Sequence, residues 1–131
     1  MKLAKISTLL LFAVAAAMAA GSAYSQSMEP AKKGQTSLGE VLQNESGMTL
    51  YTFTKDSAGK SVCNGQCAVN WPPLKATGEA KAMGAWTIVT RDDGSKQWAY
   101  KGKPLYTFIK DKAAGDTVGE GVNKVWNVAR P

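Results

Sequence analysis

One seven-residue phrase occurs twice in this chain and constrains its fold more than any other feature. LYTFTKD at residues 50–56 returns as LYTFIKD at residues 105–111, so the copies are 105 − 50 = 55 positions apart. At the same shift further residues coincide: Gly47 with Gly102, and Trp71 with Trp126. Such self-similarity indicates a duplication. Because two copies are too few for a solenoid, we expect one compact domain made of two similar halves.

The phrase has the composition of a β-strand, because its residues are mostly aromatic or β-branched and turn-forming residues flank it. Side chains alternate along a strand, so Tyr51 and Phe53 share one face, as do Tyr106 and Phe108. Further patterns predict strands over residues 38–43, 86–90 and 97–101, and turns over residues 44–47, 92–95 and 102–104. No long segment has a helical period.

These patterns predict a small single domain that is all-β or mostly β. It consists of two similar β-hairpin or meander halves, joined by irregular loops. We place the duplicated domain at residues 37–131, with halves at about 37–76 and 85–131. Residues 26–36, QSMEPAKKGQT, are polar and are predicted to be a leader without regular structure.

The N-terminal segment has the layout of a secretory signal peptide. Lys2 and Lys5 precede an apolar stretch and then small residues, and we predict a signal peptide over residues 1–25. The apolar stretch is short for a membrane span, which needs about 20 residues. No cysteine near the cleavage point offers a site for a lipid anchor. We therefore expect a periplasmic or secreted protein with no membrane span after cleavage.

Charge gives little indication of a partner. Loss of Lys2 and Lys5 with the signal lowers the formal charge from +6 to +4, and the remaining basic residues form no run. A nucleic-acid partner is therefore not expected. A small ligand or another envelope component remains open as a partner, and no cofactor is expected.

The aromatic and acidic residues of the repeat have a structural and a functional interpretation. In the structural one, large rings fill a small core, and each aspartate accepts hydrogen bonds from turn amides. In the functional one, Tyr and Asp residues from both copies form a ligand or cation site between the halves. The residues concerned are Tyr51, Phe53, Asp56, Tyr106, Phe108, Asp111, Trp71 and Trp126.

Cys63 and Cys67 are the only two cysteines, and three residues separate them. In an exported protein such a pair most often forms a disulfide. Two alternatives stay open. One is thiol–disulfide redox chemistry; the other is copper(I) binding by both thiolates with Met48 or Met83 as a third ligand.

The chain contains no histidine, which excludes Ser-His-Asp and Cys-His nucleophile systems. Glycoside hydrolysis by paired carboxylates stays formally open. However, acids such as Asp92 and Asp93 stand in turn-like sequence. We therefore do not identify a catalytic residue, and an enzyme is the less favoured interpretation.

The segments GMTLYTFTKD, CNGQCAVNWPPL, QWAYKGKPLYTFIKD and GDTVGEGVNKVW together resemble a bacterial secreted-repeat family of predicted lipoproteins. That family is described by a Tyr-x-(Phe/Trp/Tyr)-x-x-Asp motif. The resemblance covers roughly residues 38–130 and implies export and a duplicated small domain, without an agreed biochemical role. The lipoprotein label does not fit this chain, because no lipid-accepting cysteine follows its signal. The sequence thus favours a non-enzymatic envelope protein with a binding or structural role.

Overall fold

The structure, a computed structural model, describes residues 29–131, so the predicted signal peptide and residues 26–28 lie outside it. The described part is mostly β, as predicted. Its elements in chain order are β1 (Lys32–Thr36), β2 (Gly39–Gln43), β3 (Tyr51–Phe53), the short helix α2 (Gln66–Asn70), β4 (Trp86–Thr90), β5 (Lys96–Tyr100), β6 (Lys103–Pro104), the 3-10 helix η1 (Val122–Lys124) and β7 (Trp126–Val128).

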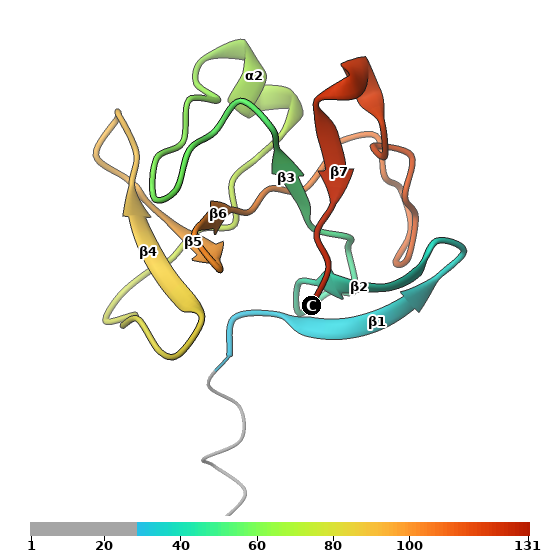
Figure 1. Cartoon of the computed structure of the whole chain (residues 1–131), viewed down its shortest axis with the longest axis horizontal. Helices are drawn as coiled ribbons and strands as arrows, with labels where there is room; N and C mark the ends of the chain where they lie inside the picture. The colour runs from blue at the N-terminus through green and yellow to red at the C-terminus, as the bar shows by residue number, and fades with distance from the viewer. Residues whose placement is uncertain (1–28) are drawn as a thin grey trace, which may run out of the picture.

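Each half opens with an antiparallel hairpin. Strands β1 and β2 form one, and β4 and β5 form the other, which β6 extends to three strands. The two hairpins lie on different sides of the molecule, at the lower right and the left of Figure 1. The β4–β5 turn is held by Asp93, whose side chain accepts a hydrogen bond from the Ser95 backbone amide. Each half therefore contributes one hairpin of its own.

The first copy of the repeated phrase forms strand β3, which pairs with β7 near the C-terminus. The strand predicted over the second copy is wrong as a regular strand, because only Tyr106 takes part, in isolated bridges with Tyr51 and Pro73. The segment opposite the second copy contains Pro72 and Pro73. Proline has no backbone N–H and cannot continue a ladder. The second copy is therefore held on both sides by isolated bridges and single hydrogen bonds, without a regular ladder.

An approximate two-fold relates the halves. The backbone amide of Tyr51 donates to the Tyr106 carbonyl at 2.8 Å, and the Tyr106 amide donates back to Tyr51 at 3.0 Å. Away from this centre, matched bonds recur at the offset of 55. The Thr54 amide donates to Val125 at 2.8 Å, and the Ile109 amide donates to Asn70 at 3.0 Å. The axis therefore passes between the two tyrosines of the repeat.

Two local expectations are corrected by the structure. Residues 32–36, assigned to a polar leader, form β1, whose main chain pairs in register with β2 from Lys32↔Gln43 to Thr36↔Gly39. Polarity did not exclude a strand, because β1 has largely exposed side chains. Lys103 and Pro104, assigned to a turn, form β6 beside β5. The actual turn is only two residues long.

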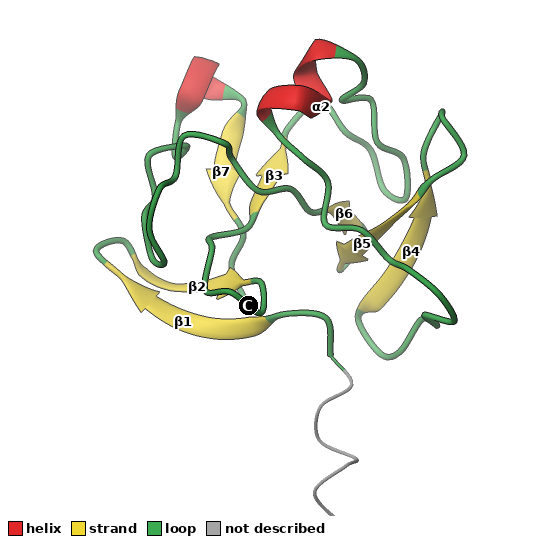
Figure 2. Ribbon diagram, turned by 180° about the vertical axis from the view of Figure 1, so that it is seen from behind, coloured by secondary structure: helices red, strands yellow, loops and turns green. Residues whose placement is uncertain are grey.

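The two short helices occupy corresponding places after the repeated phrases. Helix α2 begins at Gln66 and η1 begins at Val122, and both lie at the same end of the molecule (Figure 2). Below them the core forms two clusters. The cluster at the junction consists of Val41, Tyr51, Cys63, Trp71, Tyr106, Phe108, Trp126 and Val128. The other consists of Ala31, Leu42, Leu50, Ala76, Trp86, Trp98, Leu105 and Ala129.

Candidate functional site at the junction of the halves

The tyrosines and aspartates of the repeat meet in crossed pairs. The Tyr51 hydroxyl donates to Asp111 Oδ2 at 2.7 Å, and the Tyr106 hydroxyl donates to Asp56 Oδ2 at 2.7 Å. Both tyrosine side chains are fully buried. Each half thus supplies a tyrosine to the other half's aspartate. The two motifs form one reciprocal arrangement.

The second oxygen of each carboxylate is held by the loop that follows it. Asp56 Oδ1 accepts a hydrogen bond from the Val62 amide at 2.8 Å, and Asp111 Oδ1 accepts one from the Val118 amide at 3.0 Å. These are the turn hydrogen bonds that the sequence predicted for the aspartates. The carboxylates therefore fix both the loop and the opposite tyrosine.

Burial governs the protonation of these groups. Burial raises the pKa of the Asp56 carboxyl, although the Tyr106 and Val62 hydrogen bonds and the Arg91 charge oppose the rise. Burial likewise raises the pKa of Asp111. It also raises the pKa of both tyrosine hydroxyls far above the usual value, so they stay protonated donors at neutral pH.

Four aromatic rings stack through the junction. Trp71 and Trp126 lie parallel at the centre, with ring centroids 3.8 Å apart. Phe108 stacks on the outer face of Trp71 at 3.9 Å, and Phe53 stacks on Trp126 at 4.2 Å. Each tyrosine meets the tryptophan of its own half edge to face, at 5.3 Å for Tyr51–Trp71 and 5.1 Å for Tyr106–Trp126. The repeat residues therefore build one symmetric aromatic core across the axis.

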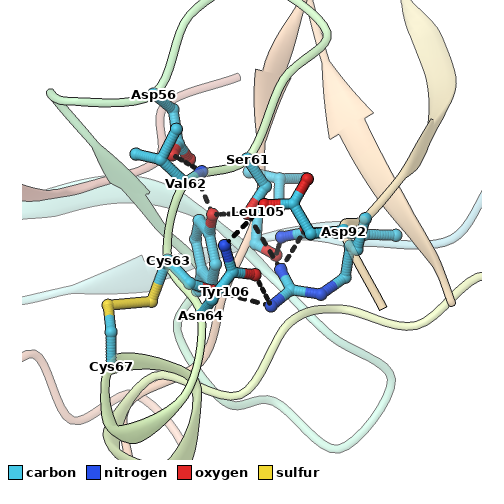
Figure 3. The surroundings of a disulfide bond; sticks show 11 residues. Asp56, Ser61, Val62, Cys63, Asn64, Cys67, Asp92, Leu105 and Tyr106 are labelled. Atoms are coloured by element: carbon cyan, nitrogen blue, oxygen red, sulfur yellow. Dashed lines mark hydrogen bonds between the residues drawn. A yellow bond between two sulfur atoms is a disulfide. The ribbon is translucent and has the colours of Figure 1, made fainter. Parts of the chain in front are cut away.

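The surroundings of the two Tyr–Asp pairs differ. The Tyr106 hydroxyl also bonds to Ser61 Oγ at 2.6 Å, as Figure 3 shows. Behind Ser61 stands the buried guanidinium of Arg91, which donates to Ser61 Oγ at 2.9 Å, Gln97 Oε1 at 2.8 Å and the Cys63 carbonyl at 2.6 Å. Sequence reasoning missed this network. Arg91 precedes two acids and a glycine and reads as part of a solvated turn.

On the other side, the Tyr51 hydroxyl accepts a hydrogen bond from the backbone amide of Gly119 at 3.1 Å. A Cβ at Gly119 would lie 2.8 Å from a Trp71 ring carbon and 2.9 Å from the Tyr51 ring. The residue must be glycine, because the backbone approaches both rings too closely for a side chain. Sequence reasoning missed this close approach of the Gly119 backbone to the two rings.

Cys63 and Cys67 form a disulfide with an S–S distance of 2.04 Å, at the start of α2 (Figure 3). Cys63 is fully buried in the junction cluster, whereas Cys67 is half-buried. Met83 packs against the other cluster and Met48 lies in the loop before β3. Within residues 29–131 no group of three or more His, Cys, Asp or Glu side chains is placed to hold a metal ion. Copper(I) binding would require reduction of the disulfide.

Two segments of this chain, residues 32–75 and 87–130, match a family model described as a secreted repeat of unknown function. The chain belongs to this family. The secreted-repeat segments start 87 − 32 = 55 positions apart, the offset of the Tyr–Asp motif, and the first begins at β1. No curated protein and no solved structure matches the chain. In the part of this secreted-repeat protein that the structure describes, no helix has the length and apolar character needed to cross a membrane.

Proposed function

We propose that this secreted-repeat protein is a non-enzymatic binding module of the cell envelope, in which the duplicated motif is structural. The signal peptide over residues 1–25 would direct it to the periplasm or the exterior. In this proposal the motif holds the two halves together, and the ligand binds on the outer surface.

One observation carries the proposal. All four polar side chains of the motif are engaged with each other and with the backbone, and the pairs are crossed between the halves. A catalytic acid or base must reach its substrate. Here the Tyr51 and Tyr106 hydroxyls are fully buried, and Asp111 is only 5% exposed. The motif is thus suited to stabilise the fold.

The alternative is thiol redox or copper(I) handling through Cys63 and Cys67. It is favoured by one feature, the half-buried Cys67, which lines an open hollow of about 430 Å³ beside Trp71 and Lys55. A thiolate could attack the Cys67 sulfur there. The structural role and the redox role predict different reduction potentials for the same pair.

The test is to fractionate the producing cells, trap the thiols by alkylation and titrate the cysteine couple. We expect the protein in the periplasmic or secreted fraction, fully oxidised, with a potential below about −300 mV, as in structural disulfides. A reduced or mixed pair, or a much higher potential, would favour redox handling instead. An anaerobic copper(I) titration against a Cys63→Ser/Cys67→Ser variant is the matched control. Tighter copper binding by the unaltered reduced protein would favour metal handling.

A further inference from the structure

A groove lies on the outer side of β3 and β7, beside the turn between β5 and β6. It consists of a hollow of about 410 Å³ and a smaller one of about 210 Å³. Both are lined by Thr52, Asn127, Lys101 and Lys103, so they form one continuous groove, here called the lysine groove. Its main hollow lies in the volume range of small-molecule sites.

The lysine groove is cationic. Lys101, Lys103 and Arg130 line it, and Asp56 is the one acid among its lining residues, which gives a formal charge of 3 − 1 = +2. The Asp56 oxygens already accept the Tyr106 hydroxyl and the Val62 amide. Among the described residues the one ion pair joins Lys60 to Asp92, so neither groove lysine has an acidic partner. Both ammonium groups can bind an added anion.

The two groove lysines have no counterparts in the first half of the duplication. At the offset of 55, Lys101 and Lys103 correspond to Ser46 and Met48, which carry no charge. The backbone conformation at Lys101 is also unfavourable for a lysine. Lys101 and Gly102 have φ of 52° and 84°, both positive, and form a two-residue hairpin turn in which Asn or Gly is preferred at the first position. A lysine at this position is consistent with a role for its side chain.

The corresponding place in the other half is more tightly packed. A Cβ at Gly47 would meet the Ala114 side chain at 2.9 Å, whereas a Cβ at the matching Gly102 would stay 3.6 Å from Ala58. Asp111 is buried there, while Asp56 is half-buried and lines the lysine groove. One of the two equivalent places is thus more tightly packed and has neither lysine, and the other lines an open hollow and has both. This difference favours the open one as a binding site.

The other lining groups define the ligand. Thr52 and Asn127, paired across β3 and β7, offer a hydroxyl and an amide, and the half-buried Phe53 offers apolar surface. Such a mixture suits a ring with hydroxyl groups and an apolar face. The formal charge of +2 favours an anionic ligand, and a sugar ring that carries a carboxylate combines that charge with hydroxyl groups and an apolar face.

We infer that the lysine groove binds a small hydroxylated carboxylate of the sugar-acid class. Its carboxylate lies against Lys101 and Lys103, its hydroxyls face Thr52 and Asn127, and its apolar face lies on Phe53. This inference rests on the proposed role as a binding module and names the ligand class of that module.

The test is a titration of the exported protein with D-galacturonate, followed by NMR amide shifts. D-galactose, acetate and inorganic phosphate serve as the comparison ligands. The groove variant is Lys101→Gln/Lys103→Gln. The matched control is Lys110→Gln/Lys112→Gln, which removes the same charge from exposed lysines outside the groove. Melting temperatures are measured for both variants to verify that they fold.

We expect saturable galacturonate binding with shifts at Thr52 and Lys103. Binding should weaken at least about tenfold in the groove variant, as for loss of charge-assisted hydrogen bonds, and stay unchanged in the control. Galactose and acetate should each bind at least about tenfold more weakly than galacturonate. Absent galacturonate binding, or equal affinity in the groove variant, would overturn the inference. If acetate or phosphate bound as tightly as galacturonate, the assignment of the ligand to the sugar-acid class would be wrong. None of these results alters the thiol and fractionation tests of the proposed function.

Discussion

The Tyr51 hydroxyl of the first half donates a 2.7 Å hydrogen bond to the Asp111 carboxylate of the second half. Tyr106 and Asp56 repeat this bond in the opposite direction. Removing one partner of either pair from the folded protein leaves the other buried without its hydrogen bond, which costs free energy. The repeated phrase is therefore best understood as a reciprocal lock between two halves.

Truncation of the central stack should strongly destabilise the fold. Trp126 is 2% exposed and stacks on both Trp71 and Phe53. We expect Trp126→Ala to lower the free energy of unfolding by about 3–5 kcal/mol, measured by urea denaturation. Val69→Ala, at a side chain that is 58% exposed, is the control and should change it by about 0.5 kcal/mol or less. A wild-type-like curve for Trp126→Ala would show that the stack is not the core.

Acidification should favour the fold through Asp56 and Asp111. Burial raises both folded-state pKa values above the usual 3.8, so in the pH window between them the folded state binds more protons than the unfolded state. Their contribution to the free energy of unfolding therefore increases as the pH falls through the raised pKa toward 3.8. Asn does not titrate, so the comparison with Asp56→Asn/Asp111→Asn isolates this contribution.

The measurement is urea denaturation of both proteins from pH 7 to pH 4. Asp92, Asp93 and Asp116 have lowered pKa values and act in the opposite sense, but they are present in both proteins and cancel in the difference. We expect wild type to gain stability relative to the variant as the pH falls. A relative loss over the same range would contradict the raised pKa values.

The disulfide should act as a modest staple. It closes a five-residue loop from Cys63 to Cys67, for which the chain-entropy relation gives about 2 kcal/mol. We expect Cys63→Ser/Cys67→Ser to lower the free energy of unfolding by about that amount and to remain folded at 25 °C. The measurement is thermal and urea denaturation, with reduced wild type as the second reference. A variant as stable as oxidised wild type would remove the structural explanation for the pair.

Arg91 should be irreplaceable by lysine. Its guanidinium is 4% exposed and bridges Ser61, Gln97 and the Cys63 carbonyl, a fork that a single ammonium cannot span. We expect Arg91→Lys to cost at least about 1–3 kcal/mol, because buried acceptors lose their donor. Arg130→Lys, at an exposed arginine, is the matched control and should cost clearly less. If both variants lost the same free energy of unfolding, the hydrogen bonds of the Arg91 guanidinium would not explain its contribution to stability.

The regular part of this fold could be predicted from the sequence. The offset of 55 predicted the two halves, and the alternation over Trp86–Thr90 predicted β4. Turn hydrogen bonds to Asp56 and Asp111 followed from their place after the phrase. These are local features, determined by neighbours in the chain.

The long-range features could not be predicted. Which tyrosine meets which aspartate depends on how the halves dock, and both the crossed and the uncrossed pairing have the same sequence pattern. Pro72 and Pro73 prevent a regular strand ladder along the second copy, and they belong to a segment far from that copy in the sequence. The burial of Arg91 depends on acceptors from two separate segments, residues 61–63 and Gln97. The lysine groove is visible only once the two copies are compared in three dimensions.

The most direct test of the reciprocal lock is a double-mutant cycle on Tyr106→Phe and Asp56→Asn, followed by urea denaturation. The crossed pair should show a coupling free energy of about 1–3 kcal/mol, because Asn has one acceptor oxygen for the two donors Tyr106 O–H and Val62 N–H, and Tyr106→Phe removes one of these donors. The uncrossed combination of Tyr51→Phe with Asp56→Asn should be additive within about 0.5 kcal/mol. Coupling in the uncrossed cycle, or additivity in the crossed one, would contradict the lock between the halves.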